Sequence, residues 1–204
     1  MSKKIYSKII HVSPSKIKYC ILPSKYCDYS QFQLVKIHPH AGVNRGVFDQ
    51  DPSGYTKIIN TNWDRKPGVL FTELLEFIAL KNHFTGKENW KNSIFAKRNV
   101  NYIKKDNTVR GFANFKKYLN VREKQIDSLF NSIIKKGIFA NKIQKKKLND
   151  NISVVLTKNS HLYFNNRGHH RLSIAKILNI SKIPVQIVVA KSEKKLEKFY
   201  LDNN

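Results

Sequence analysis

The chain has 204 residues, and its 38 lysines and arginines outweigh its 14 aspartates and glutamates to give a formal net charge of +24. This length favours one domain that buries a substantial core. The most apolar stretch, residues 69–80, is interrupted by Glu73 and Glu76 and falls short of the ~18 apolar residues of a membrane span. The N-terminal residues lack the apolar region of a secretory signal, so we expect a soluble, cytoplasmic protein.

The positive charge has two interpretations. A strongly basic protein ordinarily indicates binding to nucleic acid. However, lysine greatly outnumbers arginine, and asparagine and isoleucine are also abundant, as a strongly AT-rich coding sequence would produce without selection for binding. The densest basic run, residues 142–147, is either a polyanion contact or a solvated loop. Only local clustering of charge therefore bears on function.

The first third of the chain predicts strands that are separated by loops. Residues 4–12 alternate irregularly and predict an edge strand, and residues 33–38 predict a core strand that ends before a proline. Residues 41–53 are rich in Gly, Asn and Asp, which is typical of a loop. Residues 55–60 predict a further strand, which leads to Trp63 and Asp64.

The middle of the chain predicts helices. Residues 71–84 place apolar side chains on a broad face, with Thr72 near the N-cap and acidic residues in the first turns. Residues 88–98 predict a shorter helix. Residues 121–136 predict a longer one, because apolar residues recur with helical spacing, lysines occupy the last turn and Gly137 follows.

The last third predicts a sheet with a helix packed on it. Residues 152–157 and 161–164 predict a hairpin, and the β-branched residues 183–189 predict a buried strand. Between them, residues 171–178 carry the apolar face of a helix, which Asn179 ends as a left-handed cap. The tail, residues 192–204, predicts a short charged helix with one apolar side.

The helix over residues 171–178 begins at a glycine turn. Gly168 precedes His169, His170 and Arg171, which lie within the first helical turn. A helix N-terminus presents unpaired backbone N–H groups and the positive end of the helix dipole, so it favours an anion. Arg171 would bond two phosphate oxygens, and the histidine rings would add donors. The turn therefore predicts a phosphate site, unless Gly168 only shapes the turn and the basic cluster is solvated.

The sequence Gly168-His169-His170-Arg171-Leu172 resembles the G-x-x-R motif of the ParB/sulfiredoxin superfamily. The resemblance covers residues 151–190 well. It extends more weakly to residues 62–64 and 86–90, which are similar to the W-D and G-x-x-x-W signatures of ParB-like proteins. It implies an α/β fold with a ParB/sulfiredoxin-like mixed sheet and packed helices, in one domain with a mainly helical insertion at about residues 66–148. It also implies that the turn binds the phosphates of ATP or CTP.

Two members of the superfamily can be compared residue by residue. Sulfiredoxins have a nucleophilic cysteine where this chain has His169, so reduction of sulfinic acids is not expected. Free-serine kinases have the pattern D-G-H-T-R. His169 and Arg171 match that pattern, whereas His170 replaces the threonine and Arg167 replaces the acid. The resemblance therefore implies phosphate binding but leaves the acid to be supplied from elsewhere.

The first functional hypothesis is an ATP- or CTP-dependent phosphotransferase that acts on a small hydroxyl-bearing acceptor. Gly168, His169, His170 and Arg171 would hold the triphosphate, and Mg²⁺ would neutralise its charge. Asp64, in the W-D signature, is the expected ligand of Mg²⁺ or general base, and His169 is the second expected catalytic residue. Asp49 and Asp51 are weaker candidates. On spacing alone, a salt bridge between Asp64 and Arg65 is the favoured explanation, and the match to the W-D signature makes the two explanations about equal.

Two alternatives remain open. A basic ParB-like module would bind DNA or RNA, with the aromatic residues Phe112, Phe115 and Tyr118 stacking on bases. These aromatic residues would otherwise belong to a core, and no helix-turn-helix pattern follows the last predicted strand. A non-catalytic interaction protein would keep the fold without the chemistry, and Arg167 in the place of the acid supports this alternative.

Overall fold

A computed structural model describes residues 4–21, 54–60, 63–64, 69–106, 111–139, 151–165 and 167–203. The chain divides into two compact units. The sheet unit comprises Met1–Glu73 and Ile138–Asn204, and the helical unit comprises Leu74–Gly137. The helical unit falls inside the segment in which the sequence predicts an insertion. None of the described helices combines the length and the apolar character needed to cross a bilayer.

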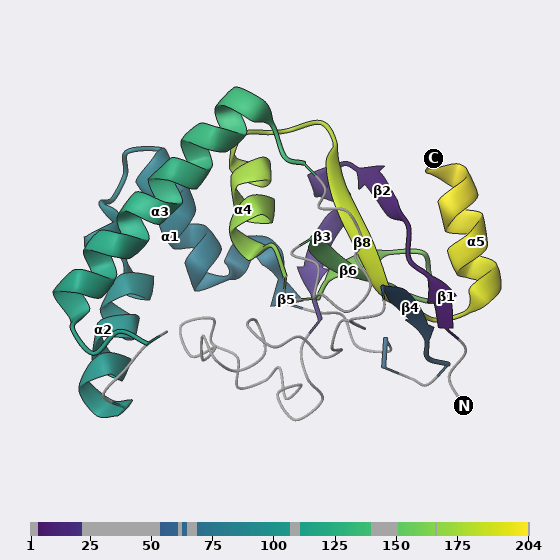
Figure 1. The fold of residues 1–204 in the computed structure, drawn as a ribbon, viewed down its shortest axis with the longest axis horizontal. Coiled ribbons are helices and arrows are strands. Elements are labelled where there is room, and N and C mark those ends of the chain that lie inside the picture. Colours follow the sequence, from purple (N-terminus) through teal and green to yellow (C-terminus); the bar gives the residue numbers. More distant parts are fainter. Residues whose placement is uncertain are drawn as a thin grey trace. The chain divides into compact units, whose positions relative to one another are not determined.

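The described part of the sheet unit contains strands and helices from both ends of the chain (Figure 1). In chain order they are β1 (Lys4–Tyr6), β2 (Ile9–Val12), the 3-10 helix η1 (Pro14–Lys16), β3 (Ile17–Cys20), β4 (Tyr55–Ile58), β5 (Val69–Leu70), the 3-10 helix η5 (Phe71–Glu73), β6 (Ile152–Leu156), β7 (Leu162–Phe164), α4 (His169–Ile177), β8 (Ile183–Ala190) and α5 (Glu193–Asp202).

Among the described residues, the strands form one mixed eight-stranded sheet in the order β1-β4-β8-β6-β7-β3-β5, and β2 also pairs with β8. β6 is parallel to β8 and antiparallel to β7, so the predicted hairpin of β6 and β7 is confirmed. The broad class, a mixed α/β protein with helices packed on a sheet, is also as predicted.

β8 is an inner strand that pairs with β2, β4 and β6, and all eight of its residues are buried. Figure 1 shows α4 and α5 on opposite sides of the strands, which explains why β8 is buried along its whole length rather than at alternate residues. Pro184 is tolerated near the start of β8, as expected. α4 ends close to the predicted position, and Asn179 has the left-handed φ of 52°.

Residues 4–12 form two strands rather than the single edge strand that the sequence predicts. β1 pairs with β4, and β2 pairs with β8. The chain changes partner at Ser7, which is buried and whose hydroxyl lies 2.8 Å from the Thr56 hydroxyl. A buried polar residue breaks the apolar pattern here because its hydroxyl is satisfied by the neighbouring strand. The predicted strand over residues 33–38 and the acids Asp49 and Asp51 lie outside the described residues.

The helical unit contains α1 (Leu75–Phe84), the 3-10 helix η6 (Trp90–Asn92), α2 (Ile94–Asp106) and α3 (Phe115–Lys136). The helix expected from residue 71 begins only at Leu75, with Leu74 rather than Thr72 at the N-cap. The helix expected over residues 88–98 begins at Ile94, because the Ser93 hydroxyl accepts a hydrogen bond from the Ala96 N–H at 3.1 Å.

α3 is longer at its start than the sequence pattern predicts. The side chain of Asn114 accepts a hydrogen bond from the Lys117 N–H at 2.9 Å and so caps a helix that begins at Phe115. The helix ends at Gly137, as expected. Of the aromatic residues considered for base stacking, Tyr118 is buried and packs on Phe112, so these two belong to a core and only Phe115 is exposed.

Candidate functional site

Gly168 occupies a position that only glycine fits. It is the N-cap of α4, with φ of 81° and ψ of 22° in the left-handed region. A Cβ atom at this position would lie 2.7 Å from the Ile152 Cγ1 atom and 2.8 Å from its Cα atom. Glycine at this position therefore lets the turn pack closely against strand β6.

Ser153 ties the segment before α4 to strand β6. Its backbone N–H donates to the Arg167 carbonyl at 3.1 Å, and its hydroxyl accepts from the Arg167 N–H at 3.1 Å. The Ser153 carbonyl accepts from the Asn165 N–H at 2.9 Å. Ser153 is itself buried, so these bonds are shielded from water and fix the direction in which α4 begins.

His169 is a core residue of the sheet unit. Only 8% of its surface is exposed, and its ring lies 5.1 Å from the Phe71 ring and 5.8 Å from the Phe164 ring, measured between centroids. A ring held between aromatic side chains contributes to packing. The structure thus gives His169 a structural position, in contrast to the phosphate-binding and catalytic roles expected from the sequence.

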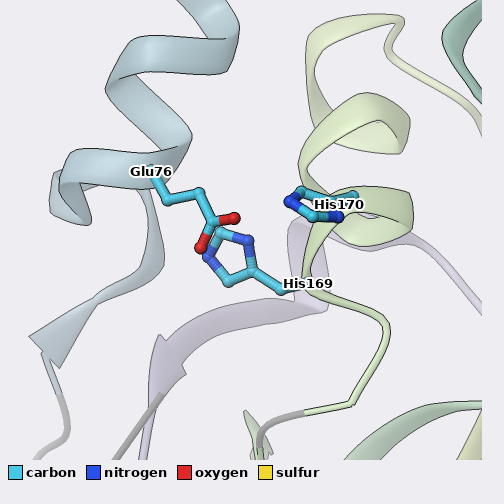
Figure 2. Close-up of side chains that lie close together, drawn as sticks. All are labelled: Glu76, His169 and His170. Carbon is cyan, nitrogen blue, oxygen red and sulfur yellow. The ribbon is translucent and has the colours of Figure 1, made fainter. Parts of the chain in front are cut away.

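His170 and Arg171 are the residues of the motif that solvent reaches. Both are half-buried, and the His170 ring is nearly perpendicular to that of His169, at 88° and 6.0 Å between centroids. Figure 2 draws the two rings with Glu76, which is a residue of α1 and belongs to the helical unit. The N-cap residue of α4 is Gly168, which has no side chain to bond the first backbone N–H groups of the helix. The first turn therefore combines a helix N-terminus that has a glycine N-cap with two basic side chains, as an anion site requires.

Asp64 lies at the other end of strand β6. Its carboxylate accepts a hydrogen bond from the Lys158 N–H at 2.6 Å and from the Lys191 ammonium at 3.1 Å. The side chains of this ion pair are 5% and 11% exposed. Burial alone would raise the pKa of the Asp64 carboxyl, but the two hydrogen bonds and the positive charge of Lys191 outweigh it and hold the pKa below its usual value.

The structure does not bring Asp64 to the Gly168 turn. Gly168 approaches Ile152, at the start of β6, whereas Asp64 binds Lys158, beyond its end. The strand from Ile152 to Leu156 alone spans about 13 Å. A contact bridged by a metal ion is shorter than this distance, because each metal–oxygen bond is only about 2.0–2.6 Å long. The expected role of Asp64 at the turn is therefore corrected, and its ion-pair partner is Lys191.

A polar pocket of about 590 Å³ surrounds Asp64. Several of its residues were not singled out from the sequence: Asn60, Thr157, Lys158, Asn159, His161, Tyr163, Lys191, Ser192 and Lys195. They come from segments that are far apart in the chain and meet where β6 and β8 end together. The only sequence signal was positional, because polar residues follow both of these predicted strands.

Comparisons with known proteins find no matching family model, no similar curated protein and no similar solved structure. The described residues define a mixed α/β protein with an eight-stranded sheet and a helix that begins at a glycine N-cap followed by basic side chains. The ParB/sulfiredoxin resemblance rests on the sequence, and the functions that it implies stay predictions.

The turn fits a phosphate group better than it fits Mg²⁺. Backbone N–H groups and the basic side chains of His170 and Arg171 are donors that suit the oxygens of an anion. Mg²⁺ prefers oxygen ligands. The side chains of residues 167–171 offer only nitrogen atoms, so these residues do not fit a directly bound Mg²⁺.

Proposed function

We propose that this protein binds a nucleoside triphosphate, ATP or CTP, through phosphate contacts at the Gly168 turn. The observation that carries the proposal is the start of α4. It is a helix N-terminus, held against β6 by a left-handed glycine N-cap and followed by His170 and Arg171, which solvent reaches. This arrangement meets the physical requirements of a phosphate site, and its sequence is similar to the G-x-x-R motif.

Phosphoryl transfer to a hydroxyl-bearing acceptor would require more than this turn. The reaction needs a group that neutralises the triphosphate and one that accepts the proton of the acceptor. Asp64 was expected to supply both, and its position at the far end of β6 removes it from either role. The proposal is therefore nucleotide binding, which a non-catalytic interaction protein would share with an enzyme.

Arg171→Ala is expected to abolish the rise in melting temperature that ATP or CTP produces in the wild-type protein. Loss of a bidentate charged contact costs about 1.5–3 kcal/mol, which is roughly a tenfold or greater loss of affinity. The measurement is a thermal shift followed by an equilibrium titration of each nucleotide, with and without Mg²⁺. Lys182→Ala removes an exposed positive charge from the same unit and is the matched control.

The outcome with Asp64→Asn completes the test. Because Asp64 lies away from the turn, this variant is expected to keep the nucleotide binding that depends on Arg171. Equal affinities of the wild-type protein and Arg171→Ala would place the triphosphate elsewhere and refute the proposal. A loss of affinity in Lys182→Ala as large as that in Arg171→Ala would attribute binding to the general positive charge.

A further inference from the structure

The pocket around Asp64 is separate from the Gly168 turn and has the size of a small-molecule site. Its volume of about 590 Å³ falls within the range of roughly 300–1,000 Å³ that is usual for ligand pockets. All the residues that line it belong to the sheet unit. The proposed nucleotide site at the turn does not account for it.

The base of the pocket is the ion pair of Asp64, which accepts hydrogen bonds, and Lys191, which donates them. Asp64 and Lys191 are both almost fully buried, and the Lys158 N–H also binds the Asp64 carboxylate. A carboxylate has about four lone-pair positions, so these two bonds leave capacity to accept hydrogen bonds from ligand hydroxyls. Asn60, Asn159 and Thr157 add further neutral polar groups to the same wall.

The rim of the pocket is positive. The side chain of Lys158 is exposed and that of Lys195 is partly exposed, and the Lys195 ammonium donates to the Lys158 carbonyl. His161, which is also exposed, lies on the same rim. The three lysines of the pocket outnumber its one carboxylate, and that carboxylate is already paired with Lys191. The excess of positive charge at the rim favours an anionic group there.

A second groove of about 400 Å³ adjoins the pocket and shares His161 and Tyr163 with it. Its walls include Tyr19 and Phe199, and the Tyr19 and Tyr163 rings lie 5.3 Å apart between centroids. Lysines also line this groove. An aromatic wall beside a polar, positively charged pocket suits a planar ring that is attached to a phosphorylated sugar.

We propose that the pocket around Asp64 and Lys191 binds a phosphorylated sugar, either alone or as part of a nucleotide. The phosphate lies at the rim, near Lys158 and Lys195. The sugar hydroxyls donate to the Asp64 carboxylate at the base. In a nucleotide, the base extends past Tyr163 into the adjoining groove.

The test is a calorimetric titration of the full chain at about 150 mM salt, where long-range surface electrostatics are screened. The probes are inorganic phosphate, ribose 5-phosphate and adenosine 5′-monophosphate. Ribose 5-phosphate is expected to bind about tenfold more tightly than inorganic phosphate, because only the sugar reaches the base of the pocket. If adenosine 5′-monophosphate binds more tightly than ribose 5-phosphate, the ligand is a nucleotide. If these two probes bind with equal affinity, the ligand is the sugar phosphate alone.

Matched variants on one helix locate the site. Lys195→Ala is expected to weaken binding of ribose 5-phosphate about tenfold, whereas Lys194→Ala, on the same helix but outside the pocket, is expected to leave it unchanged. Lys158→Ala is a second variant at an exposed position and is also expected to weaken binding. The titrations are repeated in Arg171→Ala, which removes the phosphate contact proposed at the Gly168 turn. Saturable binding that remains in this variant is assigned to the pocket around Asp64.

Three results would overturn the inference. They are the absence of saturable binding of both phosphorylated probes up to about 10 mM, equal losses of affinity in Lys195→Ala and Lys194→Ala, and loss of binding in Arg171→Ala. The second result would indicate non-specific attraction by the basic surface. The third would assign the probes to the Gly168 turn.

Discussion

Gly168 combines two constraints that are usually met separately. Its backbone conformation is left-handed, and the space where a side chain would begin is filled by Ile152. Gly86 has a similar φ of 72° but no heavy atom within 4 Å of the Cβ position. The two glycines therefore separate the cost of the backbone conformation from the cost of the close approach to β6.

Gly168→Ala is expected to lower the free energy of unfolding by about 2–4 kcal/mol, since it adds a steric clash to a left-handed strain of about 1–2 kcal/mol. Gly86→Ala, the matched control, is expected to cost only the strain. The measurement is urea unfolding of both variants. Equal losses of stability would show that β6 shifts away from the new methyl group without cost.

The ion pair of Asp64 and Lys191 makes the stability of the sheet unit depend on acid pH. The pKa of Asp64 is lower in the folded chain than in the unfolded chain, where it is about 3.9. As pH falls, the unfolded chain therefore takes up the proton first. The contribution of Asp64 to stability is complete above the unfolded pKa and is lost as pH falls through the folded pKa.

Asp64→Asn is expected to be less stable than the wild-type protein at pH 7 by about 1.5–3 kcal/mol, because Lys191 loses its charged hydrogen-bond partner. The difference should shrink below about pH 4 as the wild-type carboxyl is protonated. Urea unfolding over a pH series measures it. Glu197→Gln, at an exposed position on α5, is the control and should change stability by less than about 0.5 kcal/mol. A difference for Asp64→Asn that stays constant with pH would contradict the assignment.

At the scale of elements, the short helix η6 organises the helical unit. It contacts α1, α2 and α3, and its Trp90 side chain is fully buried beside Phe95. The backbone N–H of Trp90 donates to Nδ1 of His83 at 3.3 Å. Nε2 of His83 therefore carries the proton that is donated to the Asp127 carboxylate at 2.8 Å. In the structure, the G-x-x-x-W signature from Gly86 to Trp90 is a loop followed by a tryptophan that is buried in the core of the helical unit.

Trp90→Ala is expected to destabilise the helical unit by about 3–5 kcal/mol, which is typical for loss of a large buried side chain. Hydrogen exchange should increase in α1, α2 and α3 together, because all three helices contact η6. Ile94→Ala removes a side chain that is 55% exposed on the adjacent helix and should change exchange little. Increased exchange confined to η6 would show that the three helices hold together without Trp90.

At the scale of the whole molecule, the net charge does not by itself indicate a binding site. The net charge of +24 is spread over a chain rich in lysine, and two of the three aromatic residues considered for stacking on nucleic acid are used in a core. The charge that matters for the two proposed sites is local. It lies at the start of α4 in one case and at the ends of β6 and β8 in the other.

The sequence by itself determined the elements whose signals are local. The β-branched run of β8, the glycine turn before α4 and the caps at Asn179 and Gly137 all act through neighbouring residues, and each occurs as expected. The side chains of Asn114 and Ser93 cap their helices by accepting hydrogen bonds from backbone N–H groups. The apolar pattern does not contain these bonds, so it misplaced the start of both helices.

Only the tertiary structure decided where the site residues lie. His169 resembled a ligand residue because sequence spacing does not reveal which side chain turns into the aromatic core beside Phe71 and Phe164. Asp64 and Lys191 are 127 residues apart, and they pair because the order of strands in the sheet brings the ends of β6 and β8 together. Strand order is set by burial of the whole sheet rather than by any local pattern, so the pocket around Asp64 could be recognised only in the folded chain.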